Sequence, residues 1–345
     1  MVRTKIIATL GPSSEKDAVL RKMIRSGLDI VRLNFSHGTH AEQIKRIVSI
    51  RGLNKKMRRS VKIMQDLEGY RIRIGDLPKP IVFKRKDRFY LVQADRAKGP
   101  SEIPFNYRGP LNIIKRGTSI FVDDGKIVFK VKDRGKKRLY VEAVTDGVLK
   151  EHKGMNLPGV RFPFSSITDK DKSDLKAAFK YKPDYIAQSF VRTAKDVKDL
   201  RKIVKPRNDG CKIFAKIECT EALENLGDII KETDGIIVAR GDLGISVPIY
   251  KVPVIQKEII EECSFAGKPV VVATQMLESM TEERLPTRAE VSDVANAILD
   301  GATHVMLSGE TAIGRYPNLA VDMMNKVIKD VEDYQLRSGP RSHLI

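Results

Sequence analysis

The feature that most constrains the fold is a repeated alternation between short apolar runs and longer segments with a helical pattern. Eight runs rich in β-branched residues recur along the chain, at residues 5–10, 30–34, 61–65, 185–188, 212–216, 235–239, 269–273 and 304–307. This order is typical of βα units that build a parallel sheet. Eight such units predict an α/β protein with a (β/α)8 TIM barrel.

Polar residues in front of the helical segments mark where the helices are expected to begin. The candidate N-caps are Ser13 or Ser14, Thr220, and Thr287, the last before an amphipathic run at residues 290–299.

The barrel pattern is interrupted once, after the third strand. From residue 70 to about 154 the sequence pattern changes to alternating strands and turns. Asp123-Asp124-Gly125, after the run 119–122, predicts a hairpin. Because the insertion follows a strand's C-terminal end, where barrel active sites lie, it predicts a small all-β lid domain. The expected domains are residues 1–69 (barrel), 70–154 (lid) and 155–345 (barrel), with a hinge within 153–159, which is rich in residues that permit bending.

Composition describes an ordinary soluble chain with a strong basic bias. The 345 residues carry a net charge of +19, and residues 70–154 hold 21 Lys and Arg against 10 Asp and Glu. Such a surface steers phosphorylated metabolites, binds nucleic acid, or is simply a solvated face. The basic clusters at 84–88 and 132–138 contain little interleaved aromatic residue, so nucleic-acid binding is not the favoured interpretation.

Targeting signals and cysteine usage favour a cytoplasmic address. We find no secretory leader before the first strand and no apolar stretch long enough to span a bilayer. Cys211, Cys219 and Cys263 lack the spacing of a zinc site and cannot form a fully paired disulfide framework, so we expect reduced thiols.

Charged residues follow two neighbouring strands of the predicted barrel. Lys216-Ile217-Glu218 and Arg240-Gly241-Asp242 each come directly after an apolar run. Glu218 and Asp242 are hard oxygen ligands suited to Mg2+ or Mn2+, and Lys216 is a point charge for the same anionic substrate. The alternative is that these carboxylates cap helices or pair with nearby cations.

Seven motifs follow one another at workable spacing from residue 4 to nearly the end of the chain. They read TKIIATLGPSS (4–14), RLNFSHG (32–38), AKIE (215–218), ARGDLG (239–244), ATQMLESM (273–280), PTRAEVSDVANA (286–297) and SGETAIGRYP (308–317). Together they resemble the pyruvate kinase family. The resemblance implies a phosphotransferase of glycolysis that passes the phosphoryl group of phosphoenolpyruvate to ADP, giving pyruvate and ATP.

The resemblance also implies roles for individual residues. Lys216 and Arg32 would meet the transferred phosphoryl group, Glu218 and Asp242 would hold the divalent metal, and Gly241 and Thr274 would contact the substrate carboxylate. Thr274 with Ser308 is a candidate route for the proton that reaches the enolate.

Nucleotide contacts would come from Asn34, His37, Arg73 and Lys153, and Asp123 at the tip of the lid hairpin would help closure. His37 alone would more simply be a residue at a helix start, and Asp123 alone a turn former.

The monovalent-cation site of the family matches Asn34, Ser36, Asp66 and Leu67. Arg71 stands where K+-dependent members have Glu, and Leu67 where they have Thr, so we expect K+ not to be required, with Arg71 pairing with Asp66 or a substrate phosphate. The alternative is that Arg71 points outward as one more lid charge.

Other departures from the family pattern are Tyr70, where a hinge proline is usual, and the atypical Phe214 and Cys219. The chain stops before the further C-terminal α/β domain of most members, whether naturally or by truncation. We expect a homo-oligomer through the helix of PTRAEVSDVANA. Two other functions stay open, a metal-dependent lyase or aldolase acting on pyruvate or oxaloacetate, and a non-catalytic basic binding protein.

Overall fold

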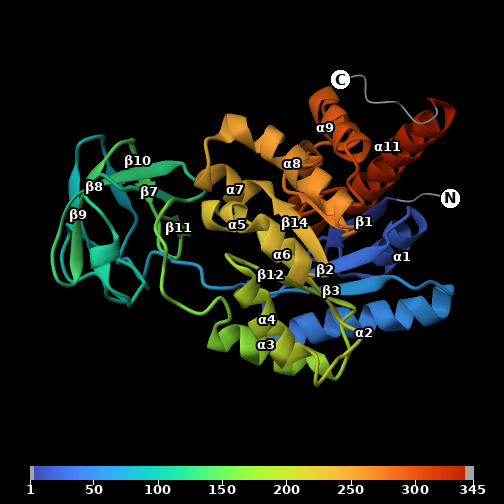
Figure 1. The fold of residues 1–345 in the computed structure, drawn as a ribbon, viewed down its shortest axis with the longest axis horizontal. Helices are drawn as coiled ribbons and strands as arrows, with labels where there is room; N and C mark the ends of the chain where they lie inside the picture. Colours follow the sequence, from blue (N-terminus) through green and yellow to red (C-terminus); the bar gives the residue numbers. More distant parts are fainter. Residues whose placement is uncertain (1–3, 339–345) are drawn as a thin grey trace.

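The computed structural model describes residues 4–338 and contains a barrel with a lid beside it (Figure 1). Eight parallel strands close the barrel in the order β1-β16-β15-β14-β13-β12-β3-β2. They are β1 Lys5–Thr9, β2 Ile30–Asn34, β3 Lys62–Asp66, β12 Tyr185–Gln188, β13 Lys212–Ile217, β14 Gly235–Ala239, β15 Val270–Ala273 and β16 His304–Leu307. The predicted TIM barrel is confirmed, with strand bounds within two residues of expectation.

Helices surround the barrel, and α11 lies between α1 and α9 to complete the ring (Figure 1). Their bounds are α1 Asp17–Arg25, α2 His40–Met57, α3 Asp169–Phe179, α4 Ala194–Val204, α5 Thr220–Glu224, α6 Leu226–Glu232, α7 Arg240–Ser246, α8 Val252–Phe265, α9 Arg288–Leu299, α10 Gly309–Ala312 and α11 Pro317–Ser338, with 3-10 turns η2 Ile249–Lys251 and η3 Glu278–Thr281. Among the described residues no helix is both long and apolar enough to cross a membrane.

The predicted helix starts are correct in one case of three. Thr287 caps α9 with a full capping box shared with Glu290. The expectation of Ser13 or Ser14 as an N-cap is wrong, because α1 begins at Asp17 and the Ser14 hydroxyl instead accepts a hydrogen bond from the backbone N–H of Gly11. Thr220 is the first residue of α5 rather than its cap, and its hydroxyl donates to the carbonyl of Ser246.

The barrel interior explains how Phe214 is accommodated. Its ring packs edge-on against Tyr185 and His304, at 5.4 and 6.1 Å between ring centroids. Gly235 lies opposite Phe214 on β14, where a Cβ would come within 2.4 Å of the ring. Phe214 on β13 therefore occupies the space that the missing side chain of Gly235 leaves on β14.

The lid is a six-stranded sheet in the order β11-β7-β8-β9-β5-β6 with a separate two-stranded sheet β10-β4. Its elements are β4 Ile81–Phe83, β5 Arg88–Val92, β6 Glu102–Pro104, η1 Leu111–Ile113, β7 Ser119–Val122, β8 Ile127–Arg134, β9 Arg138–Ala143, β10 Gly147–Leu149 and β11 Met155–Asn156. The predicted hairpin is present, since Val122 pairs with Ile127 and the turn between them has positive φ at Asp123, Asp124 and Gly125.

The lid extends past residue 154, the boundary expected from the sequence. β11 pairs with β7, and Leu157 belongs to the lid's apolar core, against which Phe162 and Phe164 also pack. The outer ends of the two expected barrel segments, residues 1–3 and 339–345, lie outside the described residues.

Candidate active site

A buried charge cluster lies where β2, β3 and β13 end. The Lys216 ammonium is 2.9 Å from the Glu218 carboxylate and 3.6 Å from Asp66, and it donates to the Ser189 hydroxyl at 2.8 Å. Arg32 Nε lies 2.5 Å from the other Asp66 oxygen. Asp66 and Glu218 are each 1 % exposed. Two cations thus share Asp66, and Lys216 is held beside Glu218.

The cluster keeps Lys216 charged. Burial alone lowers the pKa of this ammonium, but Asp66 and then Glu218 outweigh that effect, so its pKa is raised above its usual value. Burial raises the pKa of Glu218, Lys216 opposes the rise, and the negative charge of Asp242 adds to it. Two neighbouring carboxylates in a poorly solvated place favour a bound cation.

Asp242 completes the acidic side of the site from the first turn of α7. Its Oδ1 is buried and has no hydrogen-bond partner among the described residues, although Arg71 Nη2 of the lid linker lies 3.4 Å away. A carboxylate pair with one unsatisfied oxygen fits a hard divalent cation such as Mg2+ or Mn2+. Glu218 and Asp242 are therefore suitable metal ligands.

Gly241 and Thr274 lie in contact beside this acidic pair. A Cβ on Gly241 would be 3.0 Å from Thr274 Cγ2. Thr274 and Gln275 have φ of +76° and +56°, a conformation that is uncommon for residues other than glycine and most strained for the β-branched Thr274. Ser308 follows β16, the neighbour of β15, and its backbone N–H donates to Glu310.

Arg240, to which sequence reasoning gave no role, supports the strained segment. Its guanidinium donates to the carbonyls of Ala273, Thr274 and Gln275, with Nη2 2.6 Å from the Thr274 oxygen, and pairs with Asp293 at 2.8 Å. The motif ARGDLG identifies Arg240 in the sequence, but it does not predict the hydrogen bonds of its guanidinium to these backbone carbonyls.

The predicted nucleotide residues come from both the barrel and the lid. Asn34 ends β2 and His37 lies in the following loop, where Gln43 Nε2 donates to the carbonyls of both. Burial lowers the pKa of His37, and the neighbouring Arg73 lowers it further. His37 is therefore neutral at pH 7, and it precedes the true N-cap of α2, which is Thr39.

From the lid, Arg73 binds Glu68 at 2.7 Å and Lys153 binds Asp123 at 2.8 Å. The hydrogen bond from Lys153 lowers the pKa of Asp123. Asp123 thus contacts another lid residue at the end of its hairpin, and the positive φ at this position shows that it also serves as the turn former.

The predicted pairing of Arg71 with Asp66 is wrong. Asp66 is occupied by Arg32 and Lys216, and Arg71 instead pairs with Asp124 at 3.2 Å and Asp242 at 3.4 Å. The outward orientation considered for Arg71 is also excluded, because its side chain is 26 % exposed and bridges lid to barrel.

The remaining predicted monovalent-cation positions are largely engaged. Asn34 Oδ1 accepts from the Ser36 N–H at 3.1 Å, and Leu67 is 2 % exposed.

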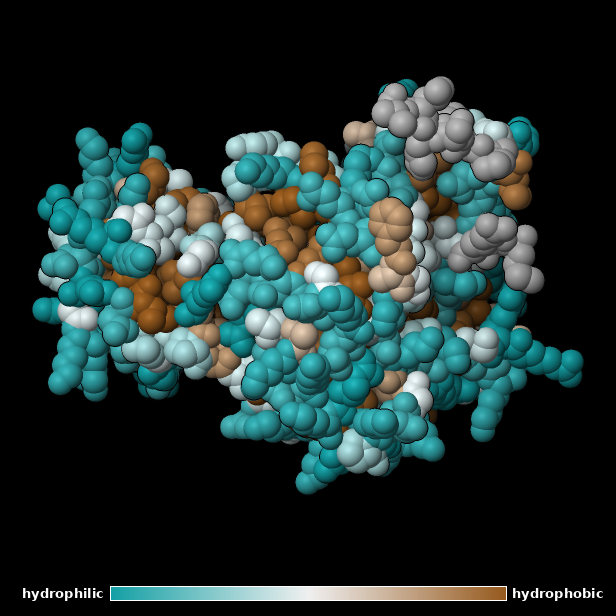
Figure 2. Space-filling model, viewed as in Figure 1, coloured by the Kyte–Doolittle hydropathy of each residue, from teal (hydrophilic) through white to brown (hydrophobic). Residues whose placement is uncertain are grey.

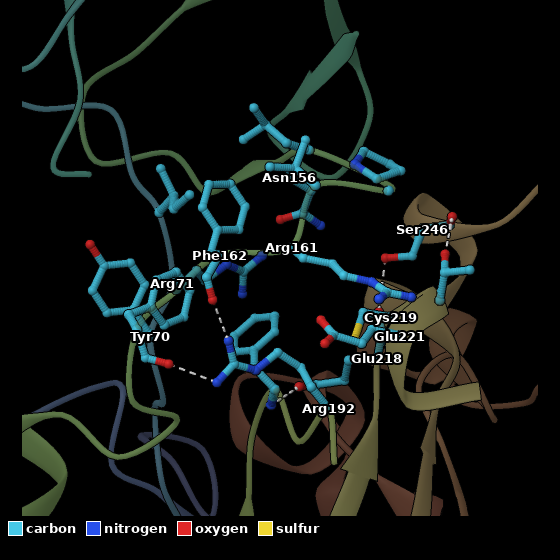
Figure 3. Close-up of a pocket in the computed structure, with 18 of the residues that line it drawn as sticks. Tyr70, Arg71, Asn156, Arg161, Phe162, Arg192, Glu218, Cys219, Glu221 and Ser246 are labelled. Carbon is cyan, nitrogen blue, oxygen red and sulfur yellow. Dashed lines mark hydrogen bonds between the residues drawn. The ribbon is translucent and has the colours of Figure 1, made fainter. Parts of the chain in front are cut away.

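A cavity of about 250 Å³ adjoins Glu218 between the lid linker and the loop after β13 (Figure 3). Tyr70 stacks on Phe164 at 3.8 Å, so the outgoing and returning linkers touch. Arg192 donates to the carbonyls of Phe162 and Phe164 at 2.7 and 2.8 Å, and Figure 3 shows it between the linker and the barrel. Sequence reasoning missed Arg192, whose guanidinium binds these two backbone carbonyls and the Asp196 carboxylate at 3.3 Å, and left open how Tyr70 replaces proline.

The cysteines have no place in this chemistry. All three are free, and burial raises the pKa of Cys211 and Cys263 to about 12 and that of Cys219 to about 11. No disulfide joins them, Cys211 and Cys219 flank β13, and their reduced state stays a prediction.

A TIM barrel with an all-β lid after its third strand, and with paired carboxylates beside a buried lysine at the barrel mouth, defines a class of barrel proteins with a lid and a candidate metal site. The family model for the pyruvate kinase barrel domain matches residues 1–321, so the chain belongs to the pyruvate kinase family.

Individual relatives support the same family membership. Curated pyruvate kinases of Staphylococcus aureus, strains USA300 and NCTC 8325, are 41 % identical over the whole chain, which covers 60 % of their length. A crystal structure of a pyruvate kinase from Cryptosporidium parvum is 40 % identical with a TM-score of 0.91, covering 96 % of this chain and 69 % of that one. The chain thus spans about three fifths of the length of the curated relatives it matches.

Proposed function

We propose that this chain transfers the phosphoryl group of phosphoenolpyruvate to ADP and releases pyruvate and ATP. The observation that carries the proposal is the buried set of Lys216, Glu218 and Asp66, with Asp242 beside it and Arg71 of the lid linker 3.4 Å from Asp242. Phosphoryl transfer depends mainly on positioning and charge neutralisation, and this arrangement offers both.

The cations would act on the transferred group. Lys216, held charged between two carboxylates, would neutralise charge on the phosphoryl group as the enol oxygen–phosphorus bond breaks and a bond to the terminal phosphate of ADP forms. Arg32 is aligned by Asp66 and Thr9, to which it donates at 2.5 and 2.9 Å, so its remaining N–H groups are available to phosphate oxygens.

Glu218 and Asp242 would hold Mg2+ or Mn2+, which supplies Lewis-acid charge and a template for substrate oxygens. The backbone of Gly241 and the hydroxyl of Thr274 would orient the substrate carboxylate, and the support from Arg240 keeps Thr274 in its strained conformation. We place Thr274 and Ser308 on the route by which a proton reaches the methylene carbon of the enolate.

Asn34 and neutral His37 from the barrel, with Arg73 and Lys153 from the lid, would bind the nucleotide. A lyase or aldolase acting on pyruvate or oxaloacetate would use the same metal ligands but has no need for these four residues. A purely structural role for the barrel would not require Lys216 to be buried.

The test is to incubate the purified chain with phosphoenolpyruvate, ADP and Mg2+ and to follow pyruvate and ATP. Both should appear in equal amounts, and Lys216→Met should lower kcat by about a thousandfold. Lys231→Met, on the exposed face of α6, is the matched control and should leave kcat unchanged. Decarboxylation of oxaloacetate without nucleotide, and no ATP, would favour the lyase instead.

We also propose that K+ is not required. Asp66 already has two cationic partners and Arg71 adds a third charge near the metal ligands, so a monovalent cation would be redundant and repelled. A homo-oligomer in the cytoplasm stays a prediction, to be checked by sedimentation velocity and by cell fractionation.

A further inference from the structure

The solvent face of the lid sheet carries two tyrosines in a cross-strand pair. In the β5–β9 ladder Tyr90 lies opposite Tyr140, and Arg138 lies opposite Val92. The alternate residues Phe89, Leu91, Leu139 and Val141 are buried in the lid core. Strand alternation therefore fixes both tyrosines and the neighbouring arginines on the outer face.

The two rings form one aromatic surface. Their centroids are 5.4 Å apart with 41° between planes, and the Arg138 guanidinium lies 4.7 Å from the centre of the Tyr90 ring. An arginine over an aromatic ring beside a second ring is the arrangement on which nucleobases stack.

Cations border this aromatic surface on the same face. Arg88 and Lys132 both pair with Glu142, at 3.4 and 2.8 Å, and Lys130 is opposite Glu142 in the next ladder. The acidic groups of the face are Glu142, Asp133 and Glu102. Glu142 is neutralised by two partners, and Arg88 remains 63 % exposed.

Two basic turns lie at opposite ends of the same ladder. Residues 84–87 lead into β5, and residues 134–137 lead into the antiparallel β9. Segments 84–88 and 130–142 together contain ten Lys and Arg against three Asp and Glu. Figure 2 shows hydrophilic side chains projecting from the lid, at the left of the view.

We propose that this face, here called the lid tyrosine face (Arg88, Tyr90, Lys130, Lys132, Arg138 and Tyr140), binds single-stranded nucleic acid. The phosphates would lie along the basic turns and the bases on the two rings. The five-residue ladder spans about 17 Å, which suits the short end of single-strand sites of about 4–16 nucleotides. The proposal does not depend on the chain's catalytic activity.

Stacking distinguishes this occupant from other polyanions. In a duplex the faces of the bases are already stacked on one another and cannot reach the rings. An anionic membrane offers charge without rings. Of the three large exposed apolar side chains of the lid, Val82 and Val148 pair with each other on the separate β4–β10 sheet, and Val144 directly follows β9. The sequence did not reveal the pair of tyrosine rings because Arg88-Phe89-Tyr90 and Arg138-Leu139-Tyr140 lie 50 residues apart.

The test is fluorescence anisotropy of a fluorescein-labelled 12-nucleotide oligouridylate, titrated with the chain at 50 to 200 mM KCl. Tyr90→Ala/Tyr140→Ala should weaken binding by at least about tenfold, and Tyr90→Phe/Tyr140→Phe should stay within about threefold of the unmodified chain. Thermal melting of each variant verifies that the lid remains folded.

Charge is tested separately. Lys130→Gln/Lys132→Gln should reduce the slope of log affinity against log salt by about 1.4, since each phosphate contact contributes about 0.7 for single strands. Lys198→Gln/Lys202→Gln on α4 of the barrel removes the same charge from exposed lysines elsewhere and should change neither slope nor affinity.

Four results would overturn the proposal: no loss of affinity in the folded alanine pair, an equal loss in the α4 control, equal affinity for a 12-base-pair duplex, or full competition by Mg2+ and ADP, which would place the oligonucleotide at the barrel mouth. Binding to vesicles with 30 % phosphatidylserine, lost in the alanine pair while oligouridylate does not bind, would assign the face to membranes.

Discussion

Replacing Lys216 with Met tests whether the lysine is the counter-charge of the buried acids. The Lys216 ammonium lies 3.6 Å from Asp66 and 2.9 Å from Glu218, and each carboxylate is 1 % exposed. The substitution therefore leaves both carboxylates without this cationic partner. Deleting one member of a buried ion pair costs about 3–5 kcal/mol. Asp66 keeps Arg32, and Glu218 keeps the hydrogen bond from the Phe190 N–H, so the lower end, about 3 kcal/mol, is expected.

The size of the expected melting shift follows from the chain's length. With about 2.1 cal/mol/K per residue, 345 residues give an unfolding entropy of about 0.7 kcal/mol/K. Lys216→Met should then lower Tm by about 4 °C in EDTA. A divalent cation at Glu218 and Asp242 would replace the missing ammonium, so Mg2+ should raise Tm more in the variant than in the unmodified chain.

Differential scanning calorimetry with EDTA or Mg2+, and with Lys231→Met as the control, measures both effects. A Tm within 1 °C of the unmodified chain in EDTA would refute the reasoning, because the buried carboxylates would then need no compensation from Lys216. An unchanged response to Mg2+ would show that the metal does not take over that compensation.

Four further outcomes are expected. Turnover should be similar in potassium and tetramethylammonium salts at matched ionic strength, and Arg71→Glu should lose activity that K+ partly restores; strong K+ activation of the unmodified chain would contradict this. Asp242→Asn should weaken Mg2+ binding at least about tenfold by isothermal titration calorimetry, and an unchanged isotherm would move the metal elsewhere. Arg240→Lys keeps the charge but loses the fork of bonds to Thr274, so kcat/KM for phosphoenolpyruvate should fall about tenfold or more with Mg2+ affinity unchanged; equal activity would remove Arg240 from the positioning of Thr274. Burial lowers the pKa of His304 from 6.5 to about 4, so the unfolded chain binds the proton first and stability is lost as pH falls from about 6.5 to 4; His304→Gln should flatten urea-unfolding stability over that window by at most about 3 kcal/mol, and an unchanged pH profile would contradict it.

The strand–helix order was predictable because each barrel strand is buried on both faces and reads as an apolar run, whereas the lid strands alternate. The charged ends of β13 and β14 were predictable for the same reason, since parallel strands bring their C-terminal ends to one rim. Lys216, Glu218 and Asp242 could therefore be placed together before their distances were known.

Contacts that depend on backbone carbonyls or on distant pairs could not be read in this way. Arg192 and Arg240 act on carbonyls whose direction is set by loops, and sequence motifs do not encode that direction. The return of the lid was placed too early because Met155 and Asn156 form only a two-residue strand, too short to produce a periodic signal. Ser14 resembled an N-cap because serine satisfies a turn and a helix start equally well.

Arg71 connects the lid to metal binding in a way that the sequence suggested only in part. Its guanidinium holds Asp124 of the lid hairpin and Asp242 of the barrel together. A divalent cation on Asp242 would compete with Arg71 for this carboxylate. Breaking the Arg71–Asp242 contact would therefore reduce the free energy of metal binding. By reciprocity, metal binding would weaken this contact between lid and barrel. Released from Asp242, Arg71 keeps Asp124 and can turn to an arriving phosphate. A glutamate at this position would remove the competition but would need a cation of its own, so we expect the Arg71→Glu substitution to change the response to potassium and the position of the lid together.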